Sequence, residues 1–261
     1  MYIRIESSSN EFYKHLKKLH TLKEREKTSH YLAEGTRAVT DAIKNGADIY
    51  AIVLREGYIC DVDLGSLKVY ELSQKLYDDI KLTVNSQGIM AVLNYSLSSA
   101  NDIDTDKLNN LLYLDTVTDP GNMGTIIRSA DALGAQAIIL SKGCVDIFNP
   151  KVVRSTMASL HNIPIYIDTD SETFFSKLSD FDIVGTFPRS HTLSCDHNYK
   201  SKTLLVMGNE ANGISDYIKS KCTSFVTIPM SGNAESLNVA TACTVMLYEI
   251  MLRKIKNNNQ R

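Results

Sequence analysis

Short apolar runs and amphipathic segments alternate along the second half of this chain. The apolar runs have the length of buried strands, and between them apolar residues recur every three or four positions, as on one face of a helix. The expected strands are 111–114, 137–140, 163–167, 182–187, 203–207 and 225–228. The expected helices are 123–133, 152–160, 171–178 and 214–221, followed by a last amphipathic helix from 237 onward. This alternation predicts an α/β domain with a mostly parallel sheet and helices on both faces.

The first part of the chain has the pattern of a smaller α/β module. A basic segment at 12–27 and a second segment at 36–44 are expected to be helices, and the apolar run at 50–54 is expected to be a strand. Residues 96–109 are rich in Ser, Asp and Asn and have little apolar periodicity, which is typical of a linker. The predicted division of the chain is a module at 1–95, a linker at 96–109 and a second domain at 110–261.

The composition is that of an ordinary globular protein, with 43% hydrophobic and 22% charged residues in a chain of 261. No apolar stretch approaches the roughly 20 residues that span a bilayer, and the N-terminus lacks the apolar run of a signal peptide. We therefore expect a cytoplasmic protein without a membrane segment.

The net charge of −2, taken alone, argues mildly against a nucleic-acid partner. Between Lys14 and Lys27, however, the basic residues outnumber the glutamates, and a local positive face is sufficient for phosphate contacts. A solvated helix face explains the same run of charges equally well.

The cysteines and histidines give no sign of a metal centre. The five cysteines are odd in number, scattered and without a CxxC pair, which predicts reduced thiols. His191, Cys195 and His197 have the residue types of a metal site, but no fourth ligand stands at a typical spacing. We expect no metal, and a polar surface loop at these residues.

Three segments rich in Gly, Asn and small polar residues directly precede or follow predicted strands. They span 119–135, 206–215 and 228–242. Ligands of open α/β sheets bind beyond the carboxyl ends of the strands, so these segments can converge on one site. No GxGxxG follows a strand, and a P-loop, a GxSxG elbow and an HExxH helix are absent from the sequence. An oxidoreductase or a methyltransferase of the dinucleotide-binding type is therefore not expected.

In this order and at this spacing, the segments DPGNMGTIIRSADALGA, VMGNEANGIS and IPMSGNAESLNVATA resemble the three motifs of the SpoU-type (TrmH family) RNA 2′-O-ribose methyltransferases. The resemblance implies a knotted SPOUT methyltransferase domain that uses S-adenosylmethionine. It also implies a C-terminal trefoil knot, which nothing in composition or periodicity indicates. Family members usually complete the site across a subunit interface, so a homodimer is implied as well.

The N-terminal module carries a second resemblance. Residues 31–43, 50–54 and 86–93 are similar to the substrate-binding domain of the same family, a small fold related to a ribosomal protein. This similarity implies that the module docks on structured RNA. Glu34 and Arg37 of the module could contact phosphate or pair with each other, and both interpretations remain open.

The first motif supplies the candidate catalytic residues Asn122 and Arg128, which match the family's Asn and catalytic Arg. The segment 120–124 is expected to form a tight turn that opens a helix and leaves Asn122 pointing at the site. In the family the Arg is proposed to help deprotonate the 2′-OH. A guanidinium is almost never neutral, so a role as a base is demanding. Binding the phosphate beside the target ribose, or polarising its hydroxyl, needs only the charged form of the side chain. A helix ion pair of Arg128 with Asp131 is the alternative.

The second and third motifs supply the remaining candidates. Gly208 would let a cofactor lie against the backbone, and Glu210 would offer a carboxylate to a donor, although a glycine-rich turn with a helix-capping Glu is the alternative. Residues 236–238 are expected to open the last helix with an N-cap. By resemblance, the catalytic candidates of these motifs are Glu210, Ser236 and Asn238. The candidates for binding the adenosine part of the cofactor are Gly208, Ile228, Met230 and Leu237.

The sequence thus predicts an enzyme that methylates a ribose 2′-OH of structured RNA. Minimal transfer-RNA enzymes of this type often lack the N-terminal module, so ribosomal RNA of the 23S type is favoured over transfer RNA. The alternatives are a transfer-RNA 2′-O-methyltransferase and a non-catalytic RNA-binding or ribosome-assembly protein with the same fold. The presence of every catalytic candidate favours the enzyme.

Overall fold

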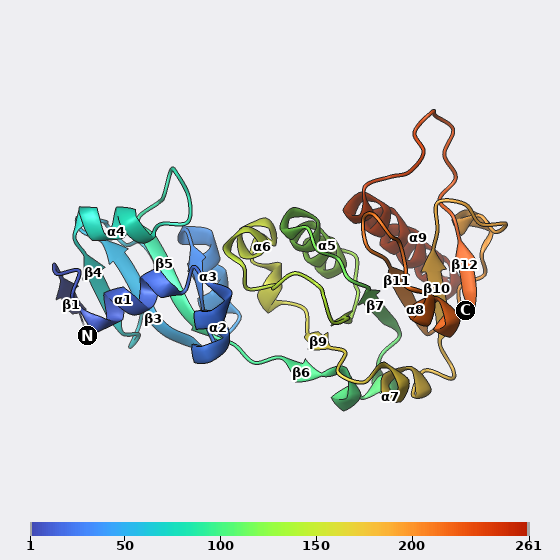
Figure 1. Cartoon of the computed structure of the whole chain (residues 1–261), viewed down its shortest axis with the longest axis horizontal. Coiled ribbons are helices and arrows are strands. Elements are labelled where there is room, and N and C mark those ends of the chain that lie inside the picture. Colours follow the sequence, from blue (N-terminus) through green and yellow to red (C-terminus); the bar gives the residue numbers. More distant parts are fainter. Residues whose placement is uncertain (1, 260–261) are drawn as a thin grey trace. The chain divides into compact units, whose positions relative to one another are not determined.

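The computed structural model describes residues 2–259 and contains two compact units (Figure 1). The first unit comprises residues 1–96 together with 146–162, and the second comprises 97–145 and 163–261. The segment 146–162 therefore lies between two parts of the second unit in sequence but packs within the first. None of the helices within residues 2–259 is long and apolar enough to cross a membrane.

The predicted domain boundaries remain a prediction. Part of the segment expected to be a linker is ordered as a short strand, β6 (Ser98–Ser99), and two 3₁₀ turns, Ala100–Asp102 and Thr105–Lys107. Ala100 and Ile103 are buried in the core of the second unit.

The first unit is built on a five-stranded mixed sheet. Its strands, in spatial order, are β1 (Tyr2–Ile5), β4 (Val69–Leu72), β3 (Ile49–Arg55), β5 (Ile89–Asn94) and β2 (His30–Glu34). Alternate strand residues, such as Val53 and Val92, point to one face, where they pack with α1 (Glu11–Lys18) and α4 (Gln74–Ile80). Helices α3 (Thr36–Lys44) and α6 (Pro150–Ser155) pack against β2.

The predicted single helix at 12–27 is wrong, because α1 and α2 (Leu22–Thr28) take its place. The side chain of Thr21 starts the second helix by accepting a hydrogen bond from the backbone N–H of Glu24. Leu19, which lies between the two helices, is buried in the core. A local cap and one buried side chain thus interrupt a helical pattern that looks continuous in the sequence.

A buried ion pair fixes the segment 146–162 within the first unit. The guanidinium of Arg25, whose side chain is only 3% exposed, donates to Asp146 Oδ2 at 2.9 and 2.7 Å and to the carbonyl of Leu19 at 2.8 Å. Close by, the ring of Phe148 stacks on that of Tyr95, with 3.8 Å between centroids. A buried guanidinium is costly without a counterion, so this pair holds the segment in place.

The helix predicted at 152–160 ends earlier than expected. α6 stops at Ser155, and Met157 and Ala158 adopt φ angles of +50° and +76°. These angles lie in the left-handed region, which a right-handed helix cannot contain. The chain therefore turns sharply after α6, and a 3₁₀ turn follows at Ser159–His161.

The second unit contains a seven-stranded sheet whose described strand pairs are all parallel. Its order is β12 (Ser224–Val226), β10 (Asp182–Thr186), β11 (Thr203–Met207), β7 (Asn110–Leu114), β8 (Ala137–Leu140), β9 (Ile165–Ile167) and β6. The helices of this unit are α5 (Pro120–Ala132), α7 (Ser171–Ser176), α8 (Asp216–Lys221) and α9 (Val239–Asn259). Each predicted strand of this half has its counterpart, and the predicted parallel sheet is confirmed.

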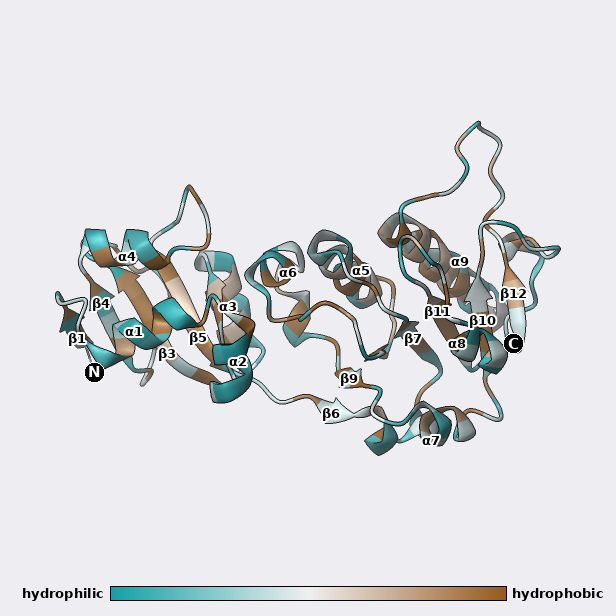
Figure 2. Cartoon of the chain, in the orientation of Figure 1, coloured by the Kyte–Doolittle hydropathy of each residue, from teal (hydrophilic) through white to brown (hydrophobic). Residues whose placement is uncertain are grey.

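Helices cover both faces of this sheet, as predicted. Leu111 and Tyr113 of β7 join a core that includes Phe174 of α7 and part of α8. Leu112 and Leu114 alternate with them and face the other side, where α9 packs against β11 and α5 packs against α9. Figure 2 shows hydrophobic residues concentrated on the central strands, among them β7 and β11.

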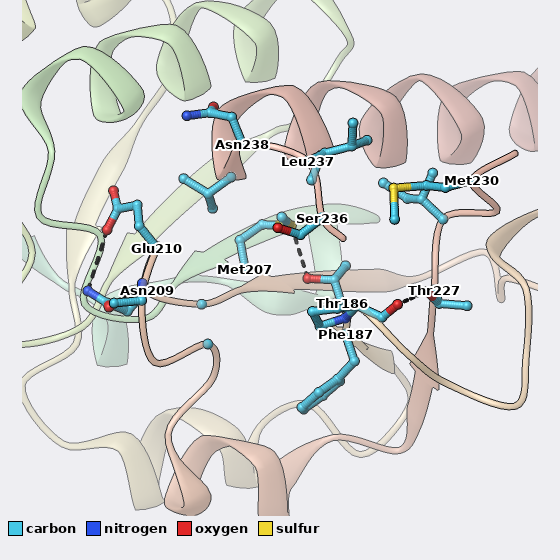
Figure 3. Close-up of a pocket in the computed structure, with 17 residues that line it drawn as sticks. Thr186, Phe187, Met207, Asn209, Glu210, Thr227, Met230, Ser236, Leu237 and Asn238 are labelled. Atoms are coloured by element: carbon cyan, nitrogen blue, oxygen red, sulfur yellow. Dashed lines mark hydrogen bonds between the residues drawn. The ribbon is translucent and has the colours of Figure 1, made fainter. Parts of the chain in front are cut away.

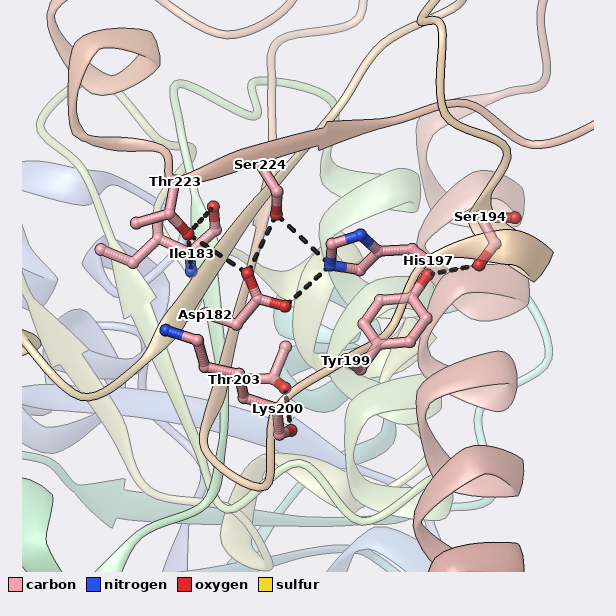
Figure 4. Close-up of polar contacts among 9 residues, drawn as sticks. All are labelled: Asp182, Ile183, Ser194, His197, Tyr199, Lys200, Thr203, Thr223 and Ser224. Carbon is pink, nitrogen blue, oxygen red and sulfur yellow. Dashed lines mark hydrogen bonds and ion pairs between the residues drawn. The ribbon is translucent and has the colours of Figure 1, made fainter.

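A buried carboxylate ties the edge of this sheet together (Figure 4). Asp182, at the start of β10, accepts hydrogen bonds from the hydroxyls of Thr223 and Ser224 at 3.2 and 3.0 Å, and it lies 2.8 Å from Nε2 of His197. His197 is thus engaged with Asp182, and no group of three metal-ligating side chains is found within residues 2–259. The network fixes the amino end of the edge strand β12, whose carboxyl end carries the third motif.

Asp146→Ala is expected to lower the free energy of unfolding by about 3–5 kcal/mol, because the substitution leaves the buried guanidinium of Arg25 without a counterion. Denaturant titration followed by circular dichroism measures the change. Asp61→Ala, at an exposed carboxylate of the same unit, is the control and should change stability by less than about 0.5 kcal/mol. Equal effects of the two substitutions would show that the ion pair does not hold the segment.

Candidate functional site

The carboxyl ends of three neighbouring strands enclose one cavity of the second unit. β12, β10 and β11 lie side by side and parallel, so the segments that follow them meet at one edge of the sheet. The cavity has a volume of about 480 Å³. Its lining residues are Thr186, Phe187, Pro188, Met207, Gly208, Asn209, Glu210, Ala211, Gly213, Thr227, Ile228, Met230, Ser236, Leu237, Asn238, Val239 and Ala242 (Figure 3).

Most of the residues predicted from the sequence meet at this cavity. Those that line it are Gly208, Glu210, Ile228, Met230, Ser236, Leu237 and Asn238. Asn122 is connected to the lining by hydrogen bonds, whereas Arg128 lies elsewhere on α5. The individual roles assigned to these residues stay predictions.

Three predicted residues, one from each motif, form a chain of hydrogen bonds. The amide nitrogen of Asn122 donates to Glu210 Oε1 at 3.0 Å, and the amide nitrogen of Asn238 donates to Asn122 Oδ1 at 2.9 Å. Asn122 therefore bridges the loop after β11 and the start of α9. This chain fixes the three motifs relative to one another at the edge of the cavity.

The carboxylate of Glu210 is surrounded by donors. Besides Asn122, it accepts from the backbone N–H groups of Thr118 and Asp119 at 3.4 and 3.3 Å. Partial burial on its own would raise the pKa of Glu210, but these hydrogen bonds outweigh it and hold the pKa below its usual value. Glu210 is therefore ionised at neutral pH and acts as an acceptor. It does not cap the next helix, since α8 begins at Asp216.

The helix of the first motif starts earlier than predicted. α5 begins at Pro120, and Asp119 caps it by accepting the backbone N–H of Asn122 at 2.7 Å. The segment 120–124, expected to form a tight turn that opens a helix at 123, is thus itself the first part of the helix. Proline at the first helical position and Asp at the cap are both favoured there. The cap places Asn122 at the edge of the cavity.

The last helix is capped by Asn238, within the segment 236–238 where an N-cap was expected, and the helix begins two residues later than the predicted start at 237. Its side-chain oxygen accepts the backbone N–H groups of Ala240 and Thr241 at 2.9 and 3.3 Å, and α9 begins at Val239. Asn238 has two tasks as a result, because its oxygen starts α9 while its nitrogen orients Asn122. Ser236 remains in the loop and lines the cavity.

The backbone next to Gly208 leaves no room for a side chain at this position. Asn209 and Gly213 exchange two backbone hydrogen bonds of 2.9 Å, which closes a tight loop directly after Gly208. A Cβ at Gly208 would lie 2.2 Å from the carbonyl carbon of Gly213 and 2.3 Å from the nitrogen of Ile214. Both are backbone atoms, so a movement of side chains cannot relieve the clash. The sequence suggested room for a ligand as the reason for this glycine, and the fold adds a steric one.

Arg128 lies on the exposed face of α5, outside the cavity of its own chain. The neighbouring residue, Ser129, faces α9, and its hydroxyl lies 2.7 Å from that of Thr244. Successive residues of a helix point about 100° apart, so Arg128 is directed away from this contact.

Two contributions to the site were missed from the sequence. Thr186, Phe187 and Pro188 belong to no motif, and they line the cavity because β10 lies between β11 and β12 in the sheet. Asn209 was not chosen as a site residue, yet its amide donates to the carbonyl of Thr116 at 2.7 Å and shapes the loop. An Asn directly after a strand and before a tight turn is a signal for such a role, whereas strand order has no local signal.

The cavity suits one small molecule with an apolar body and polar edges. Its volume lies in the range of roughly 300–1,000 Å³ that is typical of small-molecule sites. Side chains such as Ile228 and Leu237 offer apolar surface, and the loop 208–211 offers backbone polar groups. Among the described lining residues, Glu210 is the one ionisable side chain. The site is therefore built for binding and positioning more than for proton transfer.

Two family models match this chain. Residues 109–248 match the SpoU rRNA Methylase family, and residues 10–91 match the MRM3-like substrate binding domain. The chain is 32% identical over 258 residues to the 23S rRNA (guanosine(2553)-2′-O)-methyltransferase RlmP of Bacillus subtilis, covering 95% of this chain and 98% of that protein. It is 37% identical to the 23S rRNA (uridine(2479)-2′-O)-methyltransferase of Streptomyces viridochromogenes over 55% of this chain and 53% of that protein.

Solved structures have the same fold. An AdoMet-bound rRNA methyltransferase from Sinorhizobium meliloti matches with a TM-score of 0.84 and 30% identity, covering 95% of this chain and 97% of that one. The SpoU methyltransferase AviRb from Streptomyces viridochromogenes, in complex with AdoMet, matches with a TM-score of 0.84 and 26% identity over 95% and 100% of the two chains. The predicted fold class is confirmed, whereas the expected knot stays a prediction.

Gly208→Ala is expected to lower the free energy of unfolding by about 1–3 kcal/mol, because the added methyl group forces the backbone of the 209–213 loop apart. Urea titration measures this loss. The matched control is Gly232→Ala, whose Cβ would meet no atom within 4 Å and which should change stability by less than about 0.5 kcal/mol. A Gly208→Ala variant as stable as the control would mean that the loop opens freely.

Proposed function

Because this chain belongs to the SpoU rRNA methylase family, as its three motifs predicted, we propose that it transfers a methyl group from S-adenosylmethionine to a ribose 2′-OH of 23S-type ribosomal RNA. The named relatives are 23S rRNA 2′-O-methyltransferases, and the solved AviRb and Sinorhizobium meliloti structures contain AdoMet. Methylation of ribosomal RNA is consistent with the cytoplasmic location expected from the sequence. Transfer RNA is the alternative substrate.

The observation that carries this proposal is the chain of hydrogen bonds from Glu210 through Asn122 to Asn238 at the cavity. All three motifs of the family enter it, and each side chain in it has a partner from another motif. A protein that only bound RNA would have no need to keep this arrangement around a cavity of about 480 Å³. The arrangement therefore favours an enzyme over a non-catalytic assembly factor.

The residues of the cavity fit S-adenosylmethionine. The side chains of Ile228, Met230 and Leu237 give apolar surface for an adenine ring, and the backbone of the 208–211 loop gives hydrogen-bonding groups for its edges and for the ribose. Ser236 adds a hydroxyl at the same cavity. When bound, the cofactor supplies a methyl group on a positively charged sulfur.

The chain's own contribution is positioning. Glu210 and Asn238 each use one hydrogen-bonding group of the Asn122 amide, which leaves one N–H and one lone pair of Asn122 for a substrate. An amide held from both sides cannot rotate, so a ribose bound by it keeps a fixed direction relative to the cavity. Holding two reactants in line supplies a large share of the rate in reactions of this kind.

Arg128 acts across the interface of a homodimer. The outer face of α9 carries the apolar side chains of Val245, Tyr248 and Ile255, which are 37%, 50% and 48% exposed and lie on one stripe of the helix. A second copy of the chain covers this stripe. α5 packs beside α9, and the exposed position of Arg128 on α5 supports a role in which it reaches the cavity of the partner and binds the phosphate next to the target ribose.

The N-terminal module docks on the RNA. The match of residues 10–91 to a substrate-binding domain supports this role. The basic run at 14–27 contributes less charge than the sequence suggests, because Lys14 pairs with Glu11 and Lys17 with Asp79, both at 2.7 Å. Phosphate contacts therefore come from a subset of its lysines and from other parts of the module.

Methyl transfer from labelled S-adenosylmethionine tests the proposal. Purified protein is expected to label unmodified 23S rRNA, and nuclease digestion should locate the label at a 2′-O-methylated nucleotide. Label in transfer RNA alone would change the substrate class, and label on a base would overturn the ribose assignment. Cofactor binding without label in either RNA or in ribosomal particles would favour the non-catalytic alternative.

Arg128→Ala is expected to abolish methyl transfer while leaving cofactor binding intact. Mixed dimers decide where it acts: Arg128→Ala chains are combined with Leu237→Arg chains, whose cavity is blocked. Each variant alone is expected to be inactive. If Arg128 serves the partner's cavity, random pairing restores roughly one quarter of the wild-type activity. No recovered activity in verified mixed dimers would place the action of Arg128 within its own chain.

A further inference from the structure

A second cavity lies wholly within the first unit, away from any of the three motifs. Its volume is about 140 Å³, and it is lined by the segments 34–38, 82–87 and 150–158, all of which belong to that unit. A cavity of roughly 150 Å³ accepts one benzene-sized ring, and sites for whole cofactors are larger. The size therefore points to a single planar ring as the occupant.

The polar groups of this cavity have unused hydrogen-bonding capacity. Glu34 Oε2 accepts the backbone N–H of Leu82 at 2.9 Å, but Glu34 Oε1 is buried and has no hydrogen-bond partner within residues 2–259. A buried acceptor without a donor is unfavourable unless a ligand or water satisfies it. Gln87 stands beside it, with its oxygen engaged by the N–H of Thr36 at 2.8 Å and its amide nitrogen left as a donor at the cavity.

Two arginines complete the lining. Arg37 is 72% exposed and makes a 3.6 Å ion pair with Asp41, and Arg154 is exposed on α6. The pair of Glu34 with Arg37, left open by the sequence, is not formed, since each side chain has a different partner. The cavity thus presents a buried acceptor inside and two guanidiniums outside. Guanidiniums of this kind bind phosphate groups in a bidentate manner.

The backbone around the cavity is held in costly conformations. Met157 and Ala158 have φ angles of +50° and +76°, whereas Gly35, with a φ of +107°, adopts an angle that glycine tolerates without strain. Left-handed backbone is rare in residues that carry a Cβ, and it gathers at ligand sites, where the surroundings impose it. The buried pair of Arg25 with Asp146, described above, holds the segment that contains Met157 and Ala158.

We propose that this cavity binds one unpaired nucleotide of the substrate RNA. Its base inserts beside Leu82 and Val153 and donates an N–H of its Watson–Crick edge to Glu34 Oε1, while Arg37 and Arg154 bind the adjacent phosphates. Proteins read unpaired RNA in this way, by stacking or burying a base and bonding its exposed edge. The inference rests on the proposed function, because it names how the same RNA is recognised.

The first test replaces the acceptor. Glu34→Gln keeps the size and an oxygen for Leu82 but turns the free oxygen into an N–H2 donor, which repels the N–H of the base. The KM for 23S rRNA transcript should rise about tenfold, the range for losing one base contact, with kcat and cofactor affinity unchanged. Asp61→Asn, which neutralises an exposed carboxylate of the same unit, is the control. An unchanged KM for Glu34→Gln would overturn the proposal.

The second test uses two exposed arginines, whose substitution is expected to leave folding intact. Arg37→Ala and Arg154→Ala should each weaken binding of the transcript in fluorescence anisotropy. Each should also reduce the slope of log K against log salt concentration by about 0.7, the value for one single-strand phosphate contact. Lys44→Ala, an exposed cation at the other end of α3, should leave the slope unchanged. Slopes equal to that of the wild type would exclude phosphate contacts at this cavity.

These experiments separate the two proposals. If the wild-type protein methylates neither RNA, the proposed function fails whatever the cavity does. If it methylates 23S rRNA and all three cavity variants keep the wild-type KM and salt slope, only the nucleotide site fails. Equal losses for the cavity variants and their controls would likewise contradict a specific site.

Discussion

The hydrogen bonds that Asn122 makes to Glu210 and Asn238 are the constraint on which the cofactor cavity depends. The partners lie 88 and 116 positions away from Asn122 in sequence, so the contact closes two long loops at once. Because Glu210 is ionised, its hydrogen bonds are charge-assisted and stronger than those between neutral groups. Asn238 caps α9, which means that the start of the last helix and the edge of the cavity are held by the same side chain.

The two ends of the sheet in the second unit have different tasks. At the amino ends of β10 and β12, Asp182 joins His197, Thr223 and Ser224 in a partly buried network that links the two strands. At the carboxyl ends of the same strands, the chain leaves the sheet in loops that enclose the cavity. Side-chain hydrogen bonds thus join the strands at their amino ends, whereas the loops at their carboxyl ends carry the residues that line the cavity.

Local patterns predicted the elements well and their partners poorly. Apolar periodicity located α3 and the parallel strands because the spacing of apolar residues within each segment depends on how that segment is buried. It could not show that Arg25, which looks like one more charge on a basic helix, is buried against Asp146, 121 positions away. The cap at Thr21 was overlooked for a different reason: it is a local contact, but a Thr inside a polar stretch gives a weak signal.

The parts of the candidate site that lie within one segment of the chain could be predicted from the sequence. Each motif could be found by its composition, and most of the chosen residues line one cavity. The cap of α9, the steric need for Gly208 and the lining from β10 depend on which segments become neighbours, and that is decided by strand order. The proposed role of Arg128 could not be derived even from the strand order of one chain, because its proposed partner is a second chain.

The location of residues 146–162 makes the two units inseparable as pieces of chain. The polypeptide passes between them at 96, again at 145 and a third time at 162, so no single cut releases either unit intact. A protein shortened to its second half would carry Phe148, Val152 and Val153, all buried here, with no surface left to cover them. Such a fragment would be prone to aggregate. Recombination that exchanges the N-terminal module for another would have to bring a matching replacement for this inserted segment with it.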